Sequence, residues 1–260
     1  MEKSNLLKGK VAFITGGAQG IGRAVAKSFI KHGGKVILAD CDQRKLEKTV
    51  SELGKCAKGM VLDVVDEIAT ESTAKKAFEV FGTVNTVIPN AGVLFLKYGI
   101  ETTASEFRKV IDVNLTGAFI TATIFAREMI QNHIDGRIIM TSSLSGKRGG
   151  RENSAYSASK FGMIGLMHCL AAELAEKRIL VNCVCPGQME TEMLKKLFSD
   201  RAEITGTTEN EVREKLINRI PSKKLGNLDD LAGTYIYLSS ELSQYVTGQA
   251  ITVDGGWLIG

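Results

Sequence analysis

Lys-Val-Ala-Phe-Ile-Thr-Gly-Gly-Ala-Gln-Gly-Ile-Gly, from Lys10 to Gly22, joins a short apolar run to a glycine-rich turn. The apolar run predicts a buried strand. A helical pattern follows through Phe29 and stops at two glycines after His32. Glycines let the backbone approach a pyrophosphate, and a helix N-terminus offers it free N–H groups and a partial positive charge. The order strand, turn, helix therefore predicts a nucleotide-binding turn.

An acidic residue follows the second predicted strand. That strand covers Lys35 to Ala39, and Asp40 comes directly after it. A carboxylate at this place can accept hydrogen bonds from the ribose hydroxyls of adenosine and would repel a 2′-phosphate. Asp40 therefore favours NAD over NADP as cofactor, while the alternative use of Asp40 or Asp42 is to cap the following helix.

Strand and helix patterns alternate along the rest of the chain, and no linker interrupts the series. Alternation of this kind predicts an α/β fold with a doubly wound (Rossmann) parallel sheet of about seven strands and helices on both faces. The whole chain, 1–260, is expected to form one domain. Further strands are predicted at 59–62, 84–88, 138–140, 180–184 and 250–253, and helices at 43–53, 67–81, 104–110, 115–131, 156–177 and 228–239.

Tyr156 and Lys160 lie four residues apart at the start of a predicted helix, and Ser143 follows the strand that precedes it. Residues four apart share one helix face. A lysine ammonium beside a tyrosine favours the phenolate, so we expect Lys160 to lower the pKa of Tyr156. With the Ser143 hydroxyl, the three residues form a proton-transfer site for an alcohol or ketone. The alternative is a chance pairing, since Tyr and Lys four apart occur in many helices.

The assembled motifs resemble those of classical short-chain dehydrogenases/reductases, and the resemblance extends from Lys10 to about Trp257. Ser143 precedes Tyr156 by thirteen residues, the spacing of the family, which selects Ser143 over Ser142. Pro89 departs from the family, which usually has Asn there; because proline lacks an N–H, we expect a local change in sheet hydrogen bonding. The positions that match the family's cofactor residues are Thr15, Gly16, Gln19, Gly20, Ile21, Gly22, Asp40, Asp63, Val64, Asn90, Ala91, Gly92, Tyr156, Lys160, Pro186, Gly187, Met189 and Thr191.

The resemblance implies a mechanism. Tyr156 would exchange a proton with the substrate oxygen, which Ser143 would hold, and Lys160 would also hold the nicotinamide ribose. Asn114 matches the asparagine that kinks a helix and completes a water-linked proton relay in this family. The catalytic set is therefore expected to be Asn114, Ser143, Tyr156 and Lys160.

Substrate choice is expected to depend on a long segment at about 188–225, which we predict to be a lid formed by helices at 193–198 and 209–220. Lys147, Arg148 and Arg151 lie between the catalytic Ser and Tyr and could bind an anion such as a phosphate. The predicted substrate is a small polyol, a polyol phosphate or a hydroxyketone. Its expected contacts are Ser143, Ser145, Arg148, Arg151, Tyr156 and Gln188.

Two other functions stay open. The first is reduction of a 3-oxoacyl thioester, against which Asp40 counts because biosynthetic reductases usually use NADP. The second is a non-catalytic, dinucleotide-binding regulator, which stays open because a fold alone does not fix function. The complete catalytic set counts against it, since a regulator has no need to keep all four residues.

Net charge, apolar runs and cysteine content indicate which classes of partner to expect. The 260 residues carry a net charge of +4, too small to indicate nucleic-acid binding. No apolar run approaches the ~20 residues that span a bilayer, so no membrane is expected. Five cysteines, an odd number, favour reduced thiols in the cytoplasm; Cys183 and Cys185 are expected to pack on one strand face, and no metal site is expected. Related proteins commonly form tetramers through the Tyr156 helix, so we expect a homo-oligomer, either a tetramer or a dimer.

Overall fold

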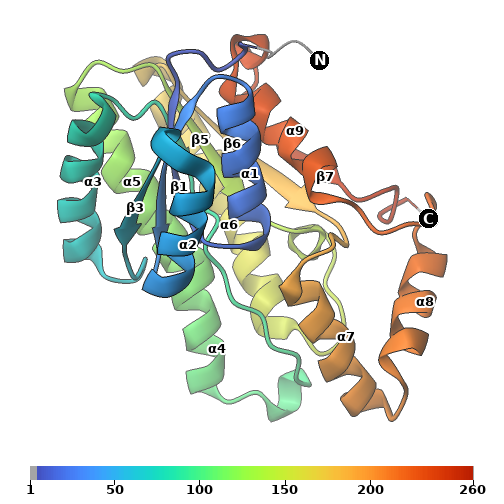
Figure 1. Cartoon of the computed structure of the whole chain (residues 1–260). Helices are drawn as coiled ribbons and strands as arrows, with labels where there is room; N and C mark the ends of the chain where they lie inside the picture. The colour runs from blue at the N-terminus through green and yellow to red at the C-terminus, as the bar shows by residue number, and fades with distance from the viewer. Residues whose placement is uncertain (1–4, 260) are drawn as a thin grey trace.

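A seven-stranded parallel sheet forms the centre of the computed structural model, which describes residues 5–259 (Figure 1). The strands lie in the order β3-β2-β1-β4-β5-β6-β7. The predicted doubly wound sheet is confirmed, with each predicted strand shifted at its ends by a few residues at most. The strands are β1 (Val11–Thr15), β2 (Lys35–Asp40), β3 (Ala57–Val61), β4 (Thr86–Ile88), β5 (Gly136–Thr141), β6 (Ile179–Pro186) and β7 (Ala250–Val253).

Helices cover both faces of this sheet (Figure 1). One hydrophobic cluster joins the sheet to α3, α5 and α6, and a second joins the opposite face to α1, α2 and α9. Alternate residues of β1 supply the two clusters, with Phe13 in the first and Ile14 in the second. The helices are α1 (Gly20–Lys31), α2 (Gln43–Leu53), α3 (Glu67–Phe81), α4 (Ala104–Ile111), α5 (Gly117–Gln131), α6 (Ser154–Leu174), α7 (Glu192–Thr205), α8 (Glu209–Arg219) and α9 (Leu228–Ser239).

Cys183 and Cys185 point into the first of these clusters from β6, and both are fully buried. Their expected packing on one strand face is confirmed. All five cysteines are free thiols.

A π-helical turn, Asp112–Thr116, joins α4 to α5 and makes one continuous helix from Ala104 to Gln131. The turn is centred on Asn114, where the family resemblance implied a kink. By length and composition this helix could cross a membrane, but 56% of its most apolar window is buried inside the fold, as in the core helix of a globular protein.

The segment after β6 forms a small hydrophobic cluster of its own, in which Leu194, Phe198 and Ala202 of α7 face Leu216 of α8 and Trp257. Because apolar residues recur every four positions up to Ala202, α7 continues to Thr205, and the predicted end at residue 198 was wrong. In Figure 1 α7 and α8 project from the body on the side to which the strands' carboxyl ends point.

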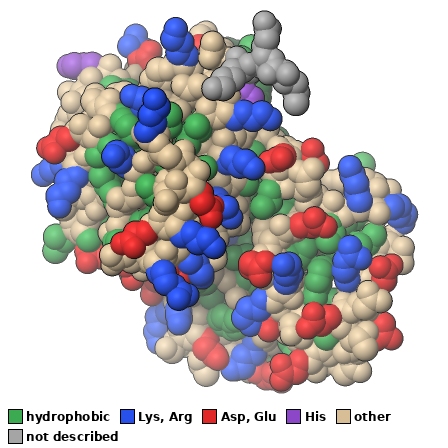
Figure 2. Space-filling view, in the orientation of Figure 1, with side chains coloured by type: hydrophobic (Ala, Val, Ile, Leu, Met, Phe, Trp, Pro, Cys, Tyr) green, Lys and Arg blue, Asp and Glu red, His purple; other side chains and the backbone are tan. Residues whose placement is uncertain are grey.

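Lysines and arginines are interspersed with acidic residues on the face shown in Figure 2. Large apolar side chains are exposed on the neighbouring helices α5 and α6, including Phe119 and Phe161. The expected oligomer stays a prediction.

We expect Phe125→Ala to lower the free energy of unfolding by about 3–5 kcal/mol, because Phe125 is fully buried and stacks on Phe13 with ring centroids 4.3 Å apart. Ile68→Ala is the control: Ile68 is 81% exposed on α3, so its truncation should cost less than about 1 kcal/mol. Urea unfolding measures both, and equal losses would contradict the assignment of the core.

Candidate active site

A cavity of about 580 Å³ opens at the carboxyl ends of the strands. Its walls come from segments far apart in the sequence, which meet because parallel strands end at one edge of the sheet. Most of the predicted site residues line it: Gly16, Gln19, Gly20, Ile21, Asp40, Asp63, Val64, Asn90, Ala91, Gly92, Ser143, Ser145, Tyr156, Lys160, Pro186, Gly187, Gln188, Met189 and Thr191. Five do not line it: Thr15, Gly22, Asn114, Arg148 and Arg151.

The glycine-rich turn brings backbone unusually close to backbone. Gly16 has a φ of +62°, and a Cβ on Gly22 would lie 2.3 Å from the carbonyl oxygen of Gly16, so neither position can carry a side chain without a shift of the loop. Gln19 precedes α1 in extended conformation and its side chain makes no capping bond, which leaves the first N–H groups of the helix for a ligand. These features fit a dinucleotide pyrophosphate. Thr15 and Gly22 thus support the turn from behind.

Asn90 fastens this turn to the end of β4. Its side-chain Nδ2 donates to the carbonyl oxygens of Thr15 (3.0 Å) and Gly16 (3.2 Å). In return, the Thr15 hydroxyl accepts hydrogen bonds from the backbone N–H groups of Asn90 (2.9 Å) and Ala91 (3.1 Å). The expected local change at Pro89 agrees with this arrangement: β4 ends at Ile88, and the Thr15 hydroxyl takes up the N–H groups that follow the proline.

Asp40 lies at the opposite end of the cavity from Tyr156, next to the turn. Its carboxylate accepts hydrogen bonds from the backbone N–H groups of Ala18 (3.1 Å) and Asp42 (3.0 Å), which fix its direction. The helix α2 is capped by Asp42, whose side chain accepts from the N–H of Lys45. Asp42 and not Asp40 is therefore the cap of α2, and Asp40 lines the cavity.

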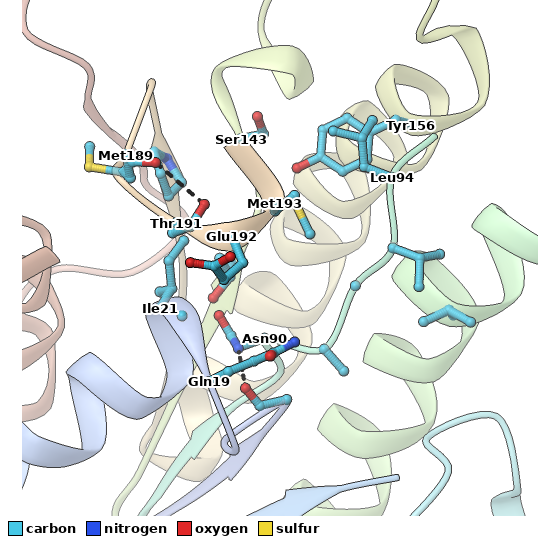
Figure 3. Close-up of a pocket in the computed structure, with 18 of the residues that line it drawn as sticks. Gln19, Ile21, Asn90, Leu94, Ser143, Tyr156, Met189, Thr191, Glu192 and Met193 are labelled. Atoms are coloured by element: carbon cyan, nitrogen blue, oxygen red, sulfur yellow. Dashed lines mark hydrogen bonds between the residues drawn. The ribbon is translucent and has the colours of Figure 1, made fainter. Parts of the chain in front are cut away.

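Ser143 and Tyr156 lie at the other end (Figure 3), and Lys160 lines the same part of the cavity one helix turn after Tyr156. The Lys160 side chain is 3% exposed, its Nζ lies 5.6 Å from the centre of the Tyr156 ring, and it donates a 2.7 Å hydrogen bond to the carbonyl of Thr141. Ser142 points away, since its hydroxyl donates to the backbone oxygen of Lys160 (3.0 Å). Of the two serines, Ser143 is therefore the one placed to act with Tyr156.

The electrostatics of this group are set by burial. Burial lowers the pKa of Lys160 to about 8, and the thiols of Cys183 and Cys185 oppose this shift without cancelling it. Burial also raises the pKa of Tyr156, and the Ser143 hydroxyl opposes this shift without cancelling it. In the cofactor-free structure the net shift of the Tyr156 pKa is therefore upward, because removal of the phenol from water has the larger effect, and the expected lowering stays a prediction for the cofactor-bound protein.

Asn114 lies behind the cavity wall and is fully buried. Its Oδ1 accepts from the N–H of Val93 (2.8 Å), and its Nδ2 donates to the Val93 carbonyl (3.0 Å) and to the hydroxyl of Ser159 (3.1 Å). Ser159 in turn donates to the carbonyl of Tyr156 (2.7 Å). Asn114 is therefore linked to the catalytic helix through Ser159, a residue that the sequence analysis did not single out.

The cations at 147–151 are not gathered at the cavity. Lys147 donates to the carbonyl of Ala250 on β7 (2.6 Å), which directs its ammonium away from Ser143. Arg148 and Arg151 are exposed and lie outside the lining. The structure thus gives no support to their predicted contact with the substrate.

Known proteins share this arrangement of fold and motifs. The sequence profile of the short chain dehydrogenase family matches residues 10–202. The chain belongs to the short-chain dehydrogenase family. Nicotinamide dinucleotide binding and oxidoreductase chemistry are properties of this family.

Individual short-chain dehydrogenases match nearly the whole chain. The 3-oxoacyl-[acyl-carrier-protein] reductase of Escherichia coli is 32% identical over 249 residues, which cover 96% of this chain and 97% of the relative. The L-rhamnose 1-dehydrogenase (NAD(P)(+)) of Azotobacter vinelandii is 32% identical over 261 residues, 98% of each chain. The structure of sorbitol-6-phosphate 2-dehydrogenase from Erwinia amylovora superposes with a TM-score of 0.91 at 31% identity, over 96% of this chain and all of that one.

Several residues line the cavity of this short-chain dehydrogenase without having been predicted. Leu94 and Val113 come from the segments beside Asn114, and Leu144 follows Ser143. Their apolar side chains gave no chemical signal, although their neighbours in the sequence did. Asn153 and the α7 residues Glu192, Met193 and Leu197 also line it. Of the predicted lid, α7 contributes to the cavity and α8 does not.

We expect the stability difference between the wild type and Lys160→Met to depend on pH. The folded-state pKa of Lys160 is about 8, below its ordinary 10.5, so between these values the unfolded chain binds more protons and the contribution of Lys160 to stability rises with pH. Between pH 7 and pH 10 the difference should move in favour of the wild type by about 2–3 kcal/mol. Urea unfolding in cofactor-free buffer at several pH values measures this, and a difference independent of pH would contradict it.

Proposed function

We propose that this protein is an NAD-dependent oxidoreductase that interconverts a secondary alcohol and a ketone, with a small polyol or hydroxyketone as substrate. The observation that carries the proposal is one continuous cavity with Asp40 at one end and Ser143, Tyr156 and Lys160 at the other. We also propose that it acts as a cytoplasmic enzyme.

The roles of the residues follow from their positions. The bound nicotinamide ring would supply or accept the hydride. The Tyr156 phenol donates a proton to a ketone oxygen or takes one from an alcohol, and the Ser143 hydroxyl holds the same oxygen by a hydrogen bond. The Lys160 ammonium, held in place by the Thr141 carbonyl, stabilises the phenolate as it forms and binds the nicotinamide ribose. The raised pKa of Tyr156 keeps the phenol protonated, the form that a ketone reduction needs.

The charges near the adenosine end support NAD. The carboxylate of Asp40 faces the position of the ribose and would repel a 2′-phosphate. Lys45, which lines the same end, forms an ion pair with Asp42 at 3.1 Å and so is already neutralised. Relatives differ in this respect, since the A. vinelandii enzyme is named for both NAD and NADP.

Reduction of a 3-oxoacyl thioester is the second candidate, because the E. coli enzyme of that activity is 32% identical to this chain. Asp40 counts against it, as a reductase of that kind usually takes NADPH. The names of the other two relatives, an L-rhamnose dehydrogenase and a sorbitol-6-phosphate dehydrogenase, support a sugar or polyol substrate. A non-catalytic regulator is disfavoured by the convergence of the catalytic residues in one cavity.

We expect the wild type to reduce NAD with at least one member of a panel of polyols and small diols. Tyr156→Phe should lower kcat/KM about a hundredfold or more, because it removes the proton donor and leaves the ring in place. Absorbance of the reduced nicotinamide measures the rate, and unchanged NAD affinity and melting temperature of the variant show that the fold is intact. Turnover of 3-oxoacyl thioesters with NADPH alone would replace the first candidate by the second. Binding of NAD without any turnover would favour a regulator.

We expect Asp40→Ser to lower kcat/KM with NAD about tenfold to a hundredfold, because the charge-assisted hydrogen bonds to the ribose are lost. The variant should also use NADP better than the wild type does, since the repulsion of the 2′-phosphate is removed. Asp66→Ser is the matched control: Asp66 caps α3 and does not line the cavity, and serine keeps a helix cap, so the cofactor preference should stay as in the wild type. Parallel kinetics with both cofactors decide, and an unchanged preference in Asp40→Ser would contradict the assignment.

A further inference from the structure

We infer that the substrate end of the cavity takes an uncharged alcohol or ketone and rejects its phosphorylated or carboxylated analogue. The inference rests on the proposed function and names the substrate class within it. Here the substrate end is the part of the lining that surrounds Ser143 and Tyr156, where Figure 3 shows Leu94 beside the Tyr156 ring and Met193 at the start of α7.

Within residues 5–259 the lining contains only two basic side chains, Lys45 and Lys160. Lys45 is at the adenosine end and is paired with Asp42. Lys160 is committed to the Thr141 carbonyl and to the catalytic tyrosine. Neither is available to an anionic group of the substrate.

Several basic side chains on the segments around the substrate end have partners of their own, and Arg148 and Arg151 lie outside the lining. Lys147 bonds the Ala250 carbonyl at 2.6 Å, and Lys97 bonds both carboxylate oxygens of Glu106 at 2.9 and 3.0 Å. On α7, Lys195 pairs with Glu192 at 2.7 Å.

Arg201, also on α7, is held by the loop that precedes the catalytic helix. Its guanidinium lies 3.3 Å from the carboxylate of Glu152, whose side chain is only 8% exposed. The backbone oxygen of Glu152 accepts a further bond, at 2.6 Å, from the N–H of Lys97. This contact directs the guanidinium toward Glu152, and Arg201 does not line the cavity.

Neutral hydrogen-bonding groups line the substrate end instead. Asn153 and Gln188 contribute amides, and Ser145 contributes a hydroxyl. The Asn153 Oδ1 accepts from the Ser157 hydroxyl at 3.0 Å, so its Nδ2 group is the part left for a ligand. Amides and hydroxyls match the hydroxyl and carbonyl groups of an uncharged substrate, and Leu94, Val113, Met193 and Leu197 add an apolar wall for its carbon chain.

A phosphate would lose its hydration here and gain no charge-assisted hydrogen bond from a basic side chain. The electrostatics of the cavity therefore favour a free polyol or hydroxyketone as substrate over a polyol phosphate.

Matched pairs that differ only in the phosphate test the inference: sorbitol with sorbitol 6-phosphate under NAD, and fructose with fructose 6-phosphate under NADH. We expect kcat/KM to favour the uncharged member by about a hundredfold or more, because an anion is desolvated without a cationic partner. Equal or better turnover of the phosphates would overturn the inference.

Three variants locate the effect. Gln188→Lys places a cation in the lining and should move the ratio of the two kcat/KM values at least about tenfold toward the phosphate, since it adds a charge-assisted contact. Gln188→Met, of similar length and without charge, should not move the ratio in that direction. The double variant Arg148→Ala/Arg151→Ala should leave the ratio as in the wild type, and a selective loss of activity toward the phosphate in it would overturn the inference.

A binding measurement separates this inference from the proposed function. The melting temperature of the NAD-saturated protein is recorded with each member of a pair. A larger rise of the melting temperature with the phosphate than with the uncharged member overturns the inference, even when neither compound is oxidised. A larger rise with the uncharged member supports it. Absence of turnover with NAD and NADP across the whole panel overturns the proposed function instead.

Discussion

The exchange of hydrogen bonds between Thr15 and the segment after β4 is the constraint on which the site depends. In the strand order, β1 and β4 are neighbours although two strands separate them in the sequence, and the direction of winding reverses between them. The helices that follow these two strands lie on opposite faces, so a crevice opens there. Asn90 and Thr15 fix the floor of that crevice, with Gly16 pressed so close to Ala91 that a Cβ would lie 2.9 Å from the Ala91 Cα. Both ends of the cavity are positioned relative to this floor.

The buried ammonium of Lys160 is held beside Tyr156 by neutral groups. Among residues 5–259 no carboxylate pairs with Lys160, and its charge is stabilised by a backbone carbonyl and by the face of a tyrosine. The Thr141 residue that supplies this carbonyl also shares a 2.8 Å hydrogen bond between its hydroxyl and that of Tyr235 on α9. The layer of helices opposite α6 therefore contacts the same residue that holds the catalytic lysine.

Much of this architecture could be predicted from the sequence, because a parallel sheet buried on both faces gives continuous apolar runs and the motifs follow the strands at fixed places. The limits of β7, α2, α3 and α9 were predicted to the residue. What could not be predicted depends on contacts between distant segments. Lys147 was expected at the substrate, but it is drawn to Ala250, about a hundred residues further along the chain, by a carbonyl that no local pattern reveals. The upward shift that burial gives the Tyr156 pKa was missed for a similar reason, since the depth of burial is a property of the folded cavity.

The small hydrophobic cluster beneath α7 and α8 contains the only tryptophan of the chain. Trp257 packs among residues of both helices, and the guanidinium of Arg219 lies 4.5 Å from the centre of its ring. Indole emission responds to its surroundings, so the intrinsic fluorescence of this protein reports on one place, the underside of the helices that wall the substrate end. The molecule thus carries its own optical probe, and any rearrangement of α7 and α8 during substrate binding can be followed in solution without a label.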